Sequence, residues 1–225
     1  MAKKIYVSPS DQTENTYAAG NTNEAVQCQA IAKLLCEALE RCGFETKTDY
    51  TLGGQAMNNR IAQSNQWGAD LHVPIHTNAF NGQLKGTRMF CHDLVGEGFK
   101  ACKAILNRLA PVVPGGSDNI QPANFAEIKR TYCACAYVEA AFHDNKEQAQ
   151  WIIDNKKQIA EAICQGICDY FSVKYVTEPE PVPVPDPEKK TIYRVQVGAY
   201  ENKTNAEAMV DYLDKIGVAG HIVEG

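Results

Sequence analysis

The first 175 residues alternate between short apolar runs and longer amphipathic stretches. Apolar runs that predict buried strands lie at 5–7, 44–48, 71–75, 86–91 and 134–140. Stretches with apolar residues every three or four positions predict helices at 23–41, 57–66, 97–109 and 145–171. Strands that alternate with helices usually form a mainly parallel sheet flanked by helices. We therefore predict an α/β fold, with a long loop at 111–124, where glycine and proline are frequent.

A proline-rich segment divides the chain. Its alternating prolines remove backbone donors and favour extended polyproline conformation, so we expect a semi-rigid spacer. The predicted parts are a domain at 1–175, a linker at 176–190 and a small module at 191–225. In the module, 191–200 alternates as a strand, 205–216 is an amphipathic helix and 221–223 is a second short strand, which predicts a βαβ unit.

Composition and charge narrow the classes of function. With 225 residues, of which 44% are hydrophobic and 22% charged, the chain can bury a full core. Its net charge of -5 and its scattered lysines and arginines argue against a nucleic-acid partner. No apolar run approaches the roughly 20 residues that cross a bilayer, and residues 1–4 lead straight into a strand without the apolar part of a signal peptide. We expect no membrane partner and synthesis in the cytoplasm.

The nine cysteines do not form a recognisable disulfide or zinc pattern. Four of them lie on helical faces beside aliphatic residues, where reduced cysteine behaves as a small hydrophobe: Cys28, Cys36, Cys164 and Cys168. The pair Cys133-Ala-Cys135 lacks the two-residue spacer of a redox or zinc motif. We therefore interpret the cysteines as core residues rather than ligands.

Two predicted strands end on residues that can carry chemistry. The strand at 71–75 ends on His76, and the strand at 134–140 carries Glu139 near its end. Ligands and reactive groups collect at the carboxyl ends of strands in open α/β sheets. Glu24, in the first turn of a helix at the same edge, is a third candidate, although an acidic residue there also stabilises a helix electrostatically. Since a hydrolytic zinc needs about three N or O ligands and a nearby carboxylate, these residues indicate a metal hydrolase site.

Three motifs follow one another in the order of a known family. They are Thr22-Asn-Glu24, the segment from Ala69 through His76-Thr-Asn78, and Tyr137-Val-Glu139. Over residues 3 to about 172 the chain resembles the type-3 zinc-dependent N-acetylmuramoyl-L-alanine amidases. These enzymes cleave the amide between the lactyl group of the glycan and the first L-alanine of the peptidoglycan stem peptide. The resemblance implies Zn²⁺ as cofactor, peptidoglycan as partner, Glu24 and His76 as metal ligands, and Glu139 as general base and proton donor.

The first family ligand is replaced in this chain. The family opens with Asp-Pro-Gly-His-Gly, whose histidine binds zinc, whereas this chain reads Ser8-Pro-Ser-Asp11-Gln12. Asp11 takes the histidine position, and a carboxylate can bind zinc. Two anionic ligands would leave the metal less Lewis acidic. Three alternatives stay open: ligation by Asp11, ligation by Gln12 or through a water, and loss of the metal.

Three further polar residues lie near these motifs. His72 points to the same face as His76 but lies about 13 Å further into the sheet, so we do not expect joint ligation. We interpret Asn78 as a residue that orients His76 or binds substrate. His143 is a second candidate for substrate binding, with a contact at the start of the following helix as the alternative.

The end of the chain resembles part of a second family. Val195-Gln-Val-Gly198-Ala-Tyr200 is similar to the signature of the SPOR module, a βαββαβ unit that binds glycan strands lacking stem peptides. Only about half of such a module is present. A lone βαβ unit leaves sheet edges unpaired and buries little surface. We therefore expect either that two tails pair between chains, giving a homodimer, or that the tail is marginally stable.

Together these observations predict a peptidoglycan amidase with a wall-targeting tail. The lack of a signal peptide fits a phage endolysin released through a membrane lesion, or a lytic enzyme that acts when a spore mother cell breaks open; we favour the endolysin. The alternative is a catalytically silent wall-binding protein that kept the amidase fold after losing its first histidine.

Overall fold

The computed structural model describes residues 2–116, 119–178 and 195–223. The chain divides into two units, Met1–Pro179 and Glu180–Gly225. Among the described residues, no helix combines the length and apolar character that a membrane span requires.

A mainly parallel sheet forms the centre of the first unit. Its strands are β1 (Lys4–Pro9), β2 (Glu45–Lys47), β3 (Leu71–Asn78), β4 (Arg88–Cys91), β5 (Ile120–Pro122), β6 (Ala134–Cys135) and β7 (Tyr137–Phe142). They lie in the order β2-β1-β3-β7-β4-β5, with the short β6 also paired to β3. All neighbouring pairs are parallel except β4 and β7. The predicted α/β fold with a mainly parallel sheet is confirmed.

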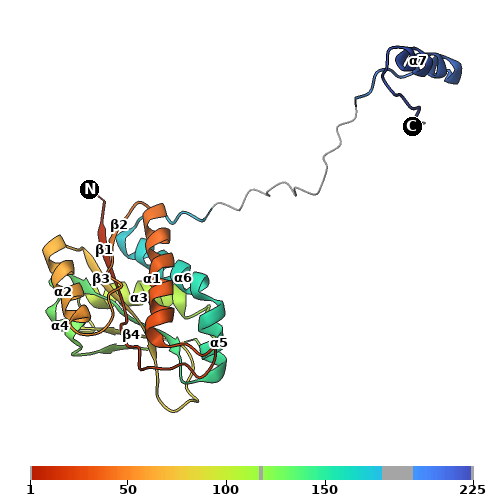
Figure 1. Ribbon diagram of the computed structural model, residues 1–225. Coiled ribbons are helices and arrows are strands. Elements are labelled where there is room, and N and C mark those ends of the chain that lie inside the picture. The colour runs from red at the N-terminus through yellow and green to blue at the C-terminus, as the bar shows by residue number, and fades with distance from the viewer. Residues whose placement is uncertain (1, 117–118, 179–194, 224–225) are drawn as a thin grey trace. The chain divides into compact units, whose positions relative to one another are not determined.

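Helices cover both faces of this sheet (Figure 1). They are α1 (Glu24–Arg41), α2 (Ala56–Trp67), α3 (Glu97–Leu109), α4 (Ala126–Arg130), α5 (Lys146–Asp154) and α6 (Lys156–Phe171). Helices α1 and α3 both pack on α6, and α2 packs on the short α4. Gly166 in α6 allows a close approach to α3, because a Cβ atom there would lie 2.3 Å from Cα of Ile105.

The two faces of the sheet differ in chemistry because side chains alternate along each strand. Ile5, Val7, Val73 and Ile75 belong to the large hydrophobic core, which also contains the apolar faces of α1, α3 and α6. The alternate positions carry polar or aromatic side chains, among them Tyr6, Ser8, His72 and His76, and contact residues of α2 and α4. The polar face is therefore where reactive groups gather.

Helix α1 starts at the edge of the sheet where β1 ends. The side chain of Asn23 caps it by accepting a hydrogen bond from the backbone of Val26 at 3.0 Å. The helix ends after Arg41, and Gly43 follows with φ of 87°, a left-handed conformation that glycine adopts without strain. The predicted start, length and stop of this helix are confirmed.

Three details of the prediction for this unit were wrong. The expected loop at 111–124 contains β5, and the segment that follows forms α4. The expected single helix at 145–171 is two helices, because Asn155 departs from helical geometry with φ of -118° and its side chain donates to the carbonyl of Trp151 at 2.9 Å. The expected strand at 134–140 is two strands, with Ala136 between them.

In the second unit the structure shows one helix, α7 (Lys203–Lys215), capped by Asn202. The predicted helix is therefore confirmed. The two strands are not: residues 195–200 and 221–223 form no strand, while 191–194 lie outside the described residues. A single βαβ unit offers each strand too few partners, which explains the difference. Most of the expected linker, 179–190, also lies outside the described residues.

Candidate active site

The site lies at the carboxyl edge of the parallel strands, where β1, β3 and β7 end. In the β3–β7 ladder, His76 is paired directly with Glu139. Glu24 opens α1 just beyond β1, and its side chain is buried, with 1% exposed. The fold thus brings together the three residues that the sequence places at strand ends and at the first helix.

His76 is held by hydrogen bonds and by stacking. Its Nδ1 donates to Oε1 of Glu24 at 2.7 Å, and its ring stacks on Tyr137 with centroids 4.6 Å apart. Its Nε2 lies 3.8 Å from Oε2 of Glu127. Burial alone would lower the pKa of His76, but the carboxylates of Glu127 and Glu24 raise it to about 10. The protonated imidazole is therefore favoured between these two carboxylates, and it would have to lose a proton to bind zinc.

Glu24 is ionised despite its burial. Asn15 donates to its Oε2 at 2.6 Å, on the side away from His76. Burial raises the pKa of this carboxyl group, but the hydrogen bond and positive charge of His76, together with Asn15, bring it below its ordinary value. Glu24 is thus held as a carboxylate in a fixed orientation.

Glu139 has a different environment from the other two carboxylates. Its Oε2 is buried and has no hydrogen-bond partner among the described residues. Burial raises the pKa of Glu139 to about 8; the charge of His76 lowers this pKa and that of Glu24 raises it. A carboxyl group with its pKa near neutrality and one unpaired oxygen is suited to moving a proton.

Glu127, on α4, belongs to the same network and was not among the predicted site residues. Its Oε1 accepts from Nε2 of His72 at 3.2 Å and from the hydroxyl of Ser8. Burial would raise the pKa of Glu127, but the hydrogen bonds and charges of His72 and His76 hold it well below its usual range. Glu127 thereby links two histidines that lie four residues apart on β3.

No strong sequence signal marks Glu127, because a glutamate in a short polar segment is normally exposed. The one hint is its place beside Ile128, which is also buried, in the segment just before the Glu139 strand. The structure connects His72 and His76 through this carboxylate, whose oxygens lie 3.2 Å from Nε2 of His72 and 3.8 Å from Nε2 of His76.

The loop after β1 places Gln12, rather than Asp11, beside His76. The amide nitrogen of Gln12 lies 3.3 Å from Nδ1 of His76. The amide oxygen of Gln12 accepts a hydrogen bond from the side chain of Asn15 at 2.8 Å. Asp11 faces the buried guanidinium of Arg60, with 3.4 Å between Oδ1 and the nearest nitrogen. Asp11 is therefore paired with Arg60, and its role as a ligand stays a prediction.

The two predicted substrate-binding residues lie at the margin of the site. Oδ1 of Asn78 accepts from the backbone of Ala79 at 2.8 Å. His143 is buried; its Nδ1 lies 2.9 Å from the carbonyl of Thr77, and its ring stacks on Tyr17. The ring of His143 thus contacts Thr77 and Tyr17 rather than the start of α5, and neither His143 nor Asn78 lines the cavity described next. Substrate binding by Asn78 and His143 stays a prediction.

A cavity of about 500 Å³ opens onto the site. Its walls combine polar and apolar side chains: Asp11, Gln12, Met57, Arg60, His76, Phe125, Ala126, Glu127, Tyr137 and Glu139. Glu24 lies behind His76 and does not line it. A substrate in this cavity would meet His76 and Glu139 directly.

The donor atoms meet only part of what a hydrolytic zinc requires. Glu24 and His76 provide a carboxylate and an imidazole in contact with each other, which are two suitable ligands. Among the described residues, no third histidine, cysteine or acidic ligand atom completes a group with them. Two of the three protein ligands that a hydrolytic zinc needs are therefore in place, and the third would have to come from Asp11 or Gln12 in the loop after β1.

Comparisons with known proteins agree with this architecture. The crystal structure of an N-acetylmuramoyl-L-alanine amidase from Clostridium difficile superposes with a TM-score of 0.67 at 21% identity, over 76% of this chain and 97% of that one. The catalytic domain of an endolysin targeting Clostridia difficile gives a TM-score of 0.63 at 21% identity, over 74% and 97%. The N-acetylmuramoyl-L-alanine amidase CwlM of Bacillus licheniformis is 22% identical over 95% of this chain and 82% of its own length.

The fold and the site define an α/β protein with a buried histidine–carboxylate centre at the carboxyl edge of its sheet. The chain belongs to the N-acetylmuramoyl-L-alanine amidase family, whose model matches residues 7–169. The family and the named relatives support peptidoglycan amidase activity, with peptidoglycan as the substrate.

Proposed function

We propose that this protein hydrolyses the amide between N-acetylmuramic acid and L-alanine in peptidoglycan, and that it depends on zinc to do so. The observation that carries the proposal is that Glu139 lines the same cavity as His76 and has one buried carboxylate oxygen without a hydrogen-bond partner among the described residues. Glu139 and His76 are neighbours in the backbone ladder, so their spacing is a property of the sheet itself.

Glu24 and His76 would hold the metal, with the third protein ligand supplied by Gln12 or Asp11. Bound zinc supplies two kinds of chemistry: it polarises the amide carbonyl and lowers the pKa of a water molecule. The contact of Gln12 with His76 makes it the nearer of the two loop residues. Asp11 would first have to leave Arg60.

The proton transfers are assigned to Glu139. Its carboxylate takes a proton from the attacking water, whose oxygen forms the new bond to the carbonyl carbon. When the C–N bond breaks, Glu139 gives that proton to the departing amino group of L-alanine, so the carboxylate is regenerated. Glu127 and Glu24 keep His76 oriented during this cycle, and Tyr137 supports its ring.

A Glu139→Gln variant tests this assignment. We expect release of stem peptides from purified walls to fall by about 10²–10⁴-fold, because the amide cannot accept a proton. Glu147→Gln, at an exposed position, is the matched control and should hydrolyse walls at the normal rate. Normal hydrolysis by Glu139→Gln would refute the role of this residue.

The second candidate function is that of a wall-binding protein without catalysis. It is favoured by the Asp11–Arg60 pair, which keeps the replaced ligand away from the metal position. Zinc analysis of the purified chain, followed by assays of stem-peptide release and of wall binding, separates the two. Stoichiometric zinc and release support the amidase, whereas wall binding without release in added zinc supports the silent protein.

We further propose that the protein acts as a phage endolysin on the wall after release from the cytoplasm, with residues 191–225 as a wall-binding, SPOR-like tail that pairs between chains. The exposed apolar side chains of the tail, including Val195, Val197 and Tyr212, support pairing. Gel filtration with multi-angle light scattering should show a dimer. A monomer whose tail amides are strongly protected in hydrogen exchange would refute the pairing.

A further inference from the structure

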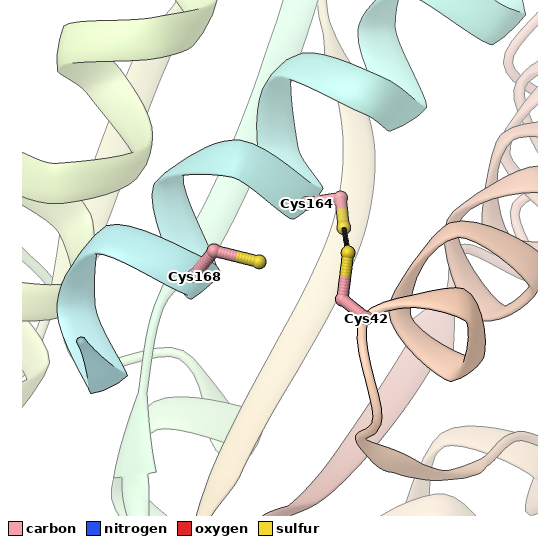
Figure 2. Close-up of side chains that lie close together, drawn as sticks. All are labelled: Cys42, Cys164 and Cys168. Carbon is pink, nitrogen blue, oxygen red and sulfur yellow. Dashed lines mark hydrogen bonds between the residues drawn. The ribbon is translucent and has the colours of Figure 1, made fainter. Parts of the chain in front are cut away.

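Three cysteine thiols meet at the end of α1 opposite to the active site (Figure 2). Cys42 follows α1, and Cys164 and Cys168 lie one turn apart on α6. All three residues are buried, and their Sγ atoms lie within 4.8 Å of one another. Among the described residues, this is the one group of three or more histidine, cysteine or acidic side chains with ligand atoms this close.

The spacing of the sulfur atoms matches metal coordination. Cys42 and Cys164 have their Sγ atoms 3.8 Å apart. Two thiolates bound to one tetrahedral zinc, each at about 2.3 Å, are themselves about 3.8 Å apart. A disulfide would need about 2.05 Å instead. The pair is thus already at the separation of two ligands on a common ion, without movement of the backbone.

The surroundings of the thiols favour a bound cation. Helix α1 ends at its cap residue, Cys42, and the partial negative charge at its carboxyl end attracts positive ions. Cys164 and Cys168 face Cys42 from the side of α6 (Figure 2). The backbone N–H of Val176 donates to Sγ of Cys42 at 3.3 Å, a contact that stabilises a thiolate.

The chain leaves the first unit directly over this cluster. Arg41 donates to the carbonyl of Val176 at 2.9 Å and forms an ion pair with Glu161 on α6. Tyr175 also hydrogen-bonds Glu161 at 2.5 Å. These contacts hold residues 175–176 against α1 and α6, so an ion bound by the thiols would be enclosed by ordered chain.

We propose that Cys42, Cys164 and Cys168 form a structural site for a thiophilic metal ion, with Zn²⁺ as the ion that fits it. On binding, each of the three thiols gives its proton to solvent and coordinates as a thiolate; no electron transfer takes place. A fourth position remains for water. The site joins the end of α1 to α6 about 27 Å along the helix from Glu24, since α1 has 18 residues at about 1.5 Å each.

Cobalt titration of the full chain, reduced and stripped of metal, tests the proposal. Co²⁺ is the probe because its bonds to sulfur give a charge-transfer band in the near ultraviolet, which ligands such as Glu24 and His76 cannot produce. We expect one equivalent of Co²⁺ to develop this band and Zn²⁺ to displace it. Failure of the proposed amidase activity would leave this signal unchanged, so the two proposals are tested separately.

Variants locate the ligands. Cys42→Ser, Cys164→Ser and Cys168→Ser should each weaken Co²⁺ binding by more than about 100-fold, because each removes a direct ligand. Cys36→Ser is the matched control, since Cys36 is a buried cysteine of α1 outside the cluster, and it should keep the band. A band that survives in all three cluster variants would overturn the proposal.

Two measurements on the unmodified chain avoid any failure of a variant to fold. Zn²⁺ should protect these three cysteines, and not the other six, from alkylation mapped by mass spectrometry. At 100-fold over the dissociation constant it should also raise the melting temperature by about 5–10 °C. Absence of the cobalt band with fully reduced thiols, or formation of a Cys42–Cys164 disulfide in place of metal binding, would contradict the assignment.

Discussion

The two ends of α1 carry two different kinds of cluster. At its start, Glu24 belongs to a network of charged groups in which each partner is fixed by hydrogen bonds. Just past its end, Cys42 meets two thiols through weak, long contacts. A charged group can be buried only when it has a partner of opposite charge or a hydrogen bond. The network at the start of α1 supplies these partners from the protein itself, without a metal. Thiols are neutral and need no such partners, so the sulfur atoms of this cluster stay available to an ion.

The strongest way to break the charged end is to remove Glu127. A Glu127→Gln change leaves His72 and His76 facing a neutral group, and we expect a loss of about 3–5 kcal/mol of unfolding free energy at pH 7. Because the pKa of Glu127 is lowered on folding, this contribution is present above the unfolded pKa near 4.3 and disappears as the pH falls below it. Urea unfolding of the natural chain and the variant at pH 7 measures the loss of free energy, and the same comparison at pH 3 shows whether the loss becomes smaller in acid.

The control is Glu147→Gln, which removes an exposed carboxylate paired with Lys85 and should cost at most about 1 kcal/mol. Equal losses for the two variants at pH 7 would show that the buried network contributes no more than a surface ion pair.

Glu139 sharpens the comparison because it is the one carboxylate of the charged end with an unpaired oxygen. Its pKa is raised on folding to about 8, so the protonated form is favoured in the folded state. The contribution of Glu139 to the free energy of unfolding is therefore fully present below its unfolded pKa of about 4.3, and it is lost as the pH rises through about 8. In buffer with a chelator that removes metal ions, the free energy of unfolding of Glu139→Gln should therefore exceed that of the natural chain above pH 8, by a few kcal/mol. Thermal unfolding from pH 5 to pH 9 tests this, and parallel pH curves would contradict it.

The thiol end is most easily disturbed through Gly166, which lies between Cys164 and Cys168 on α6. Gly166→Ala places a methyl group against the backbone of α3, and we expect a loss of about 1–3 kcal/mol. Because α6 must shift, Co²⁺ binding should also weaken. Gln158→Ala, at an exposed position of the same helix, should change neither the urea midpoint nor the cobalt titration.

The smallest effect is expected at Arg41, above the thiols. Arg41→Met removes the ion pair with Glu161, whose two side chains are 18% and 19% exposed, and the hydrogen bond to Val176. We expect a loss of about 1 kcal/mol in urea unfolding. Lys3→Met, which breaks a pair with exposures of 49% and 31%, should cost less. A larger loss for Lys3→Met would show that the more buried of the two ion pairs does not contribute more to the free energy of unfolding.

Much of the fold could be predicted from the sequence because helix and strand periods are local properties. The start of α1 at Asn23 and the strand ends at His76 and Glu139 are marked by capping and by apolar runs. Glu127 could not be found in this way, because its partners on β1 and β3 are distant in sequence. The same holds for Cys42, which lies 122 residues from Cys164.

Two other differences have local causes that the pattern does not show. The side chain of Asp11 turns to Arg60, a residue of α2 that the family motif does not mention. The expected tail strands fail because strands require neighbours, whereas the helix α7 forms its own hydrogen bonds. The zinc ligand set and the SPOR-like module stay predictions.

The direct pairing of His76 with Glu139 has a consequence for how this protein can change. The ladder between β3 and β7 loses its regular register immediately beyond that pair, between His76 and Asn78. Irregular backbone thus begins only after the two reactive side chains have been aligned. Insertions or deletions in the loops beyond would leave their alignment untouched, so substrate preference can evolve there while the centre is inherited intact.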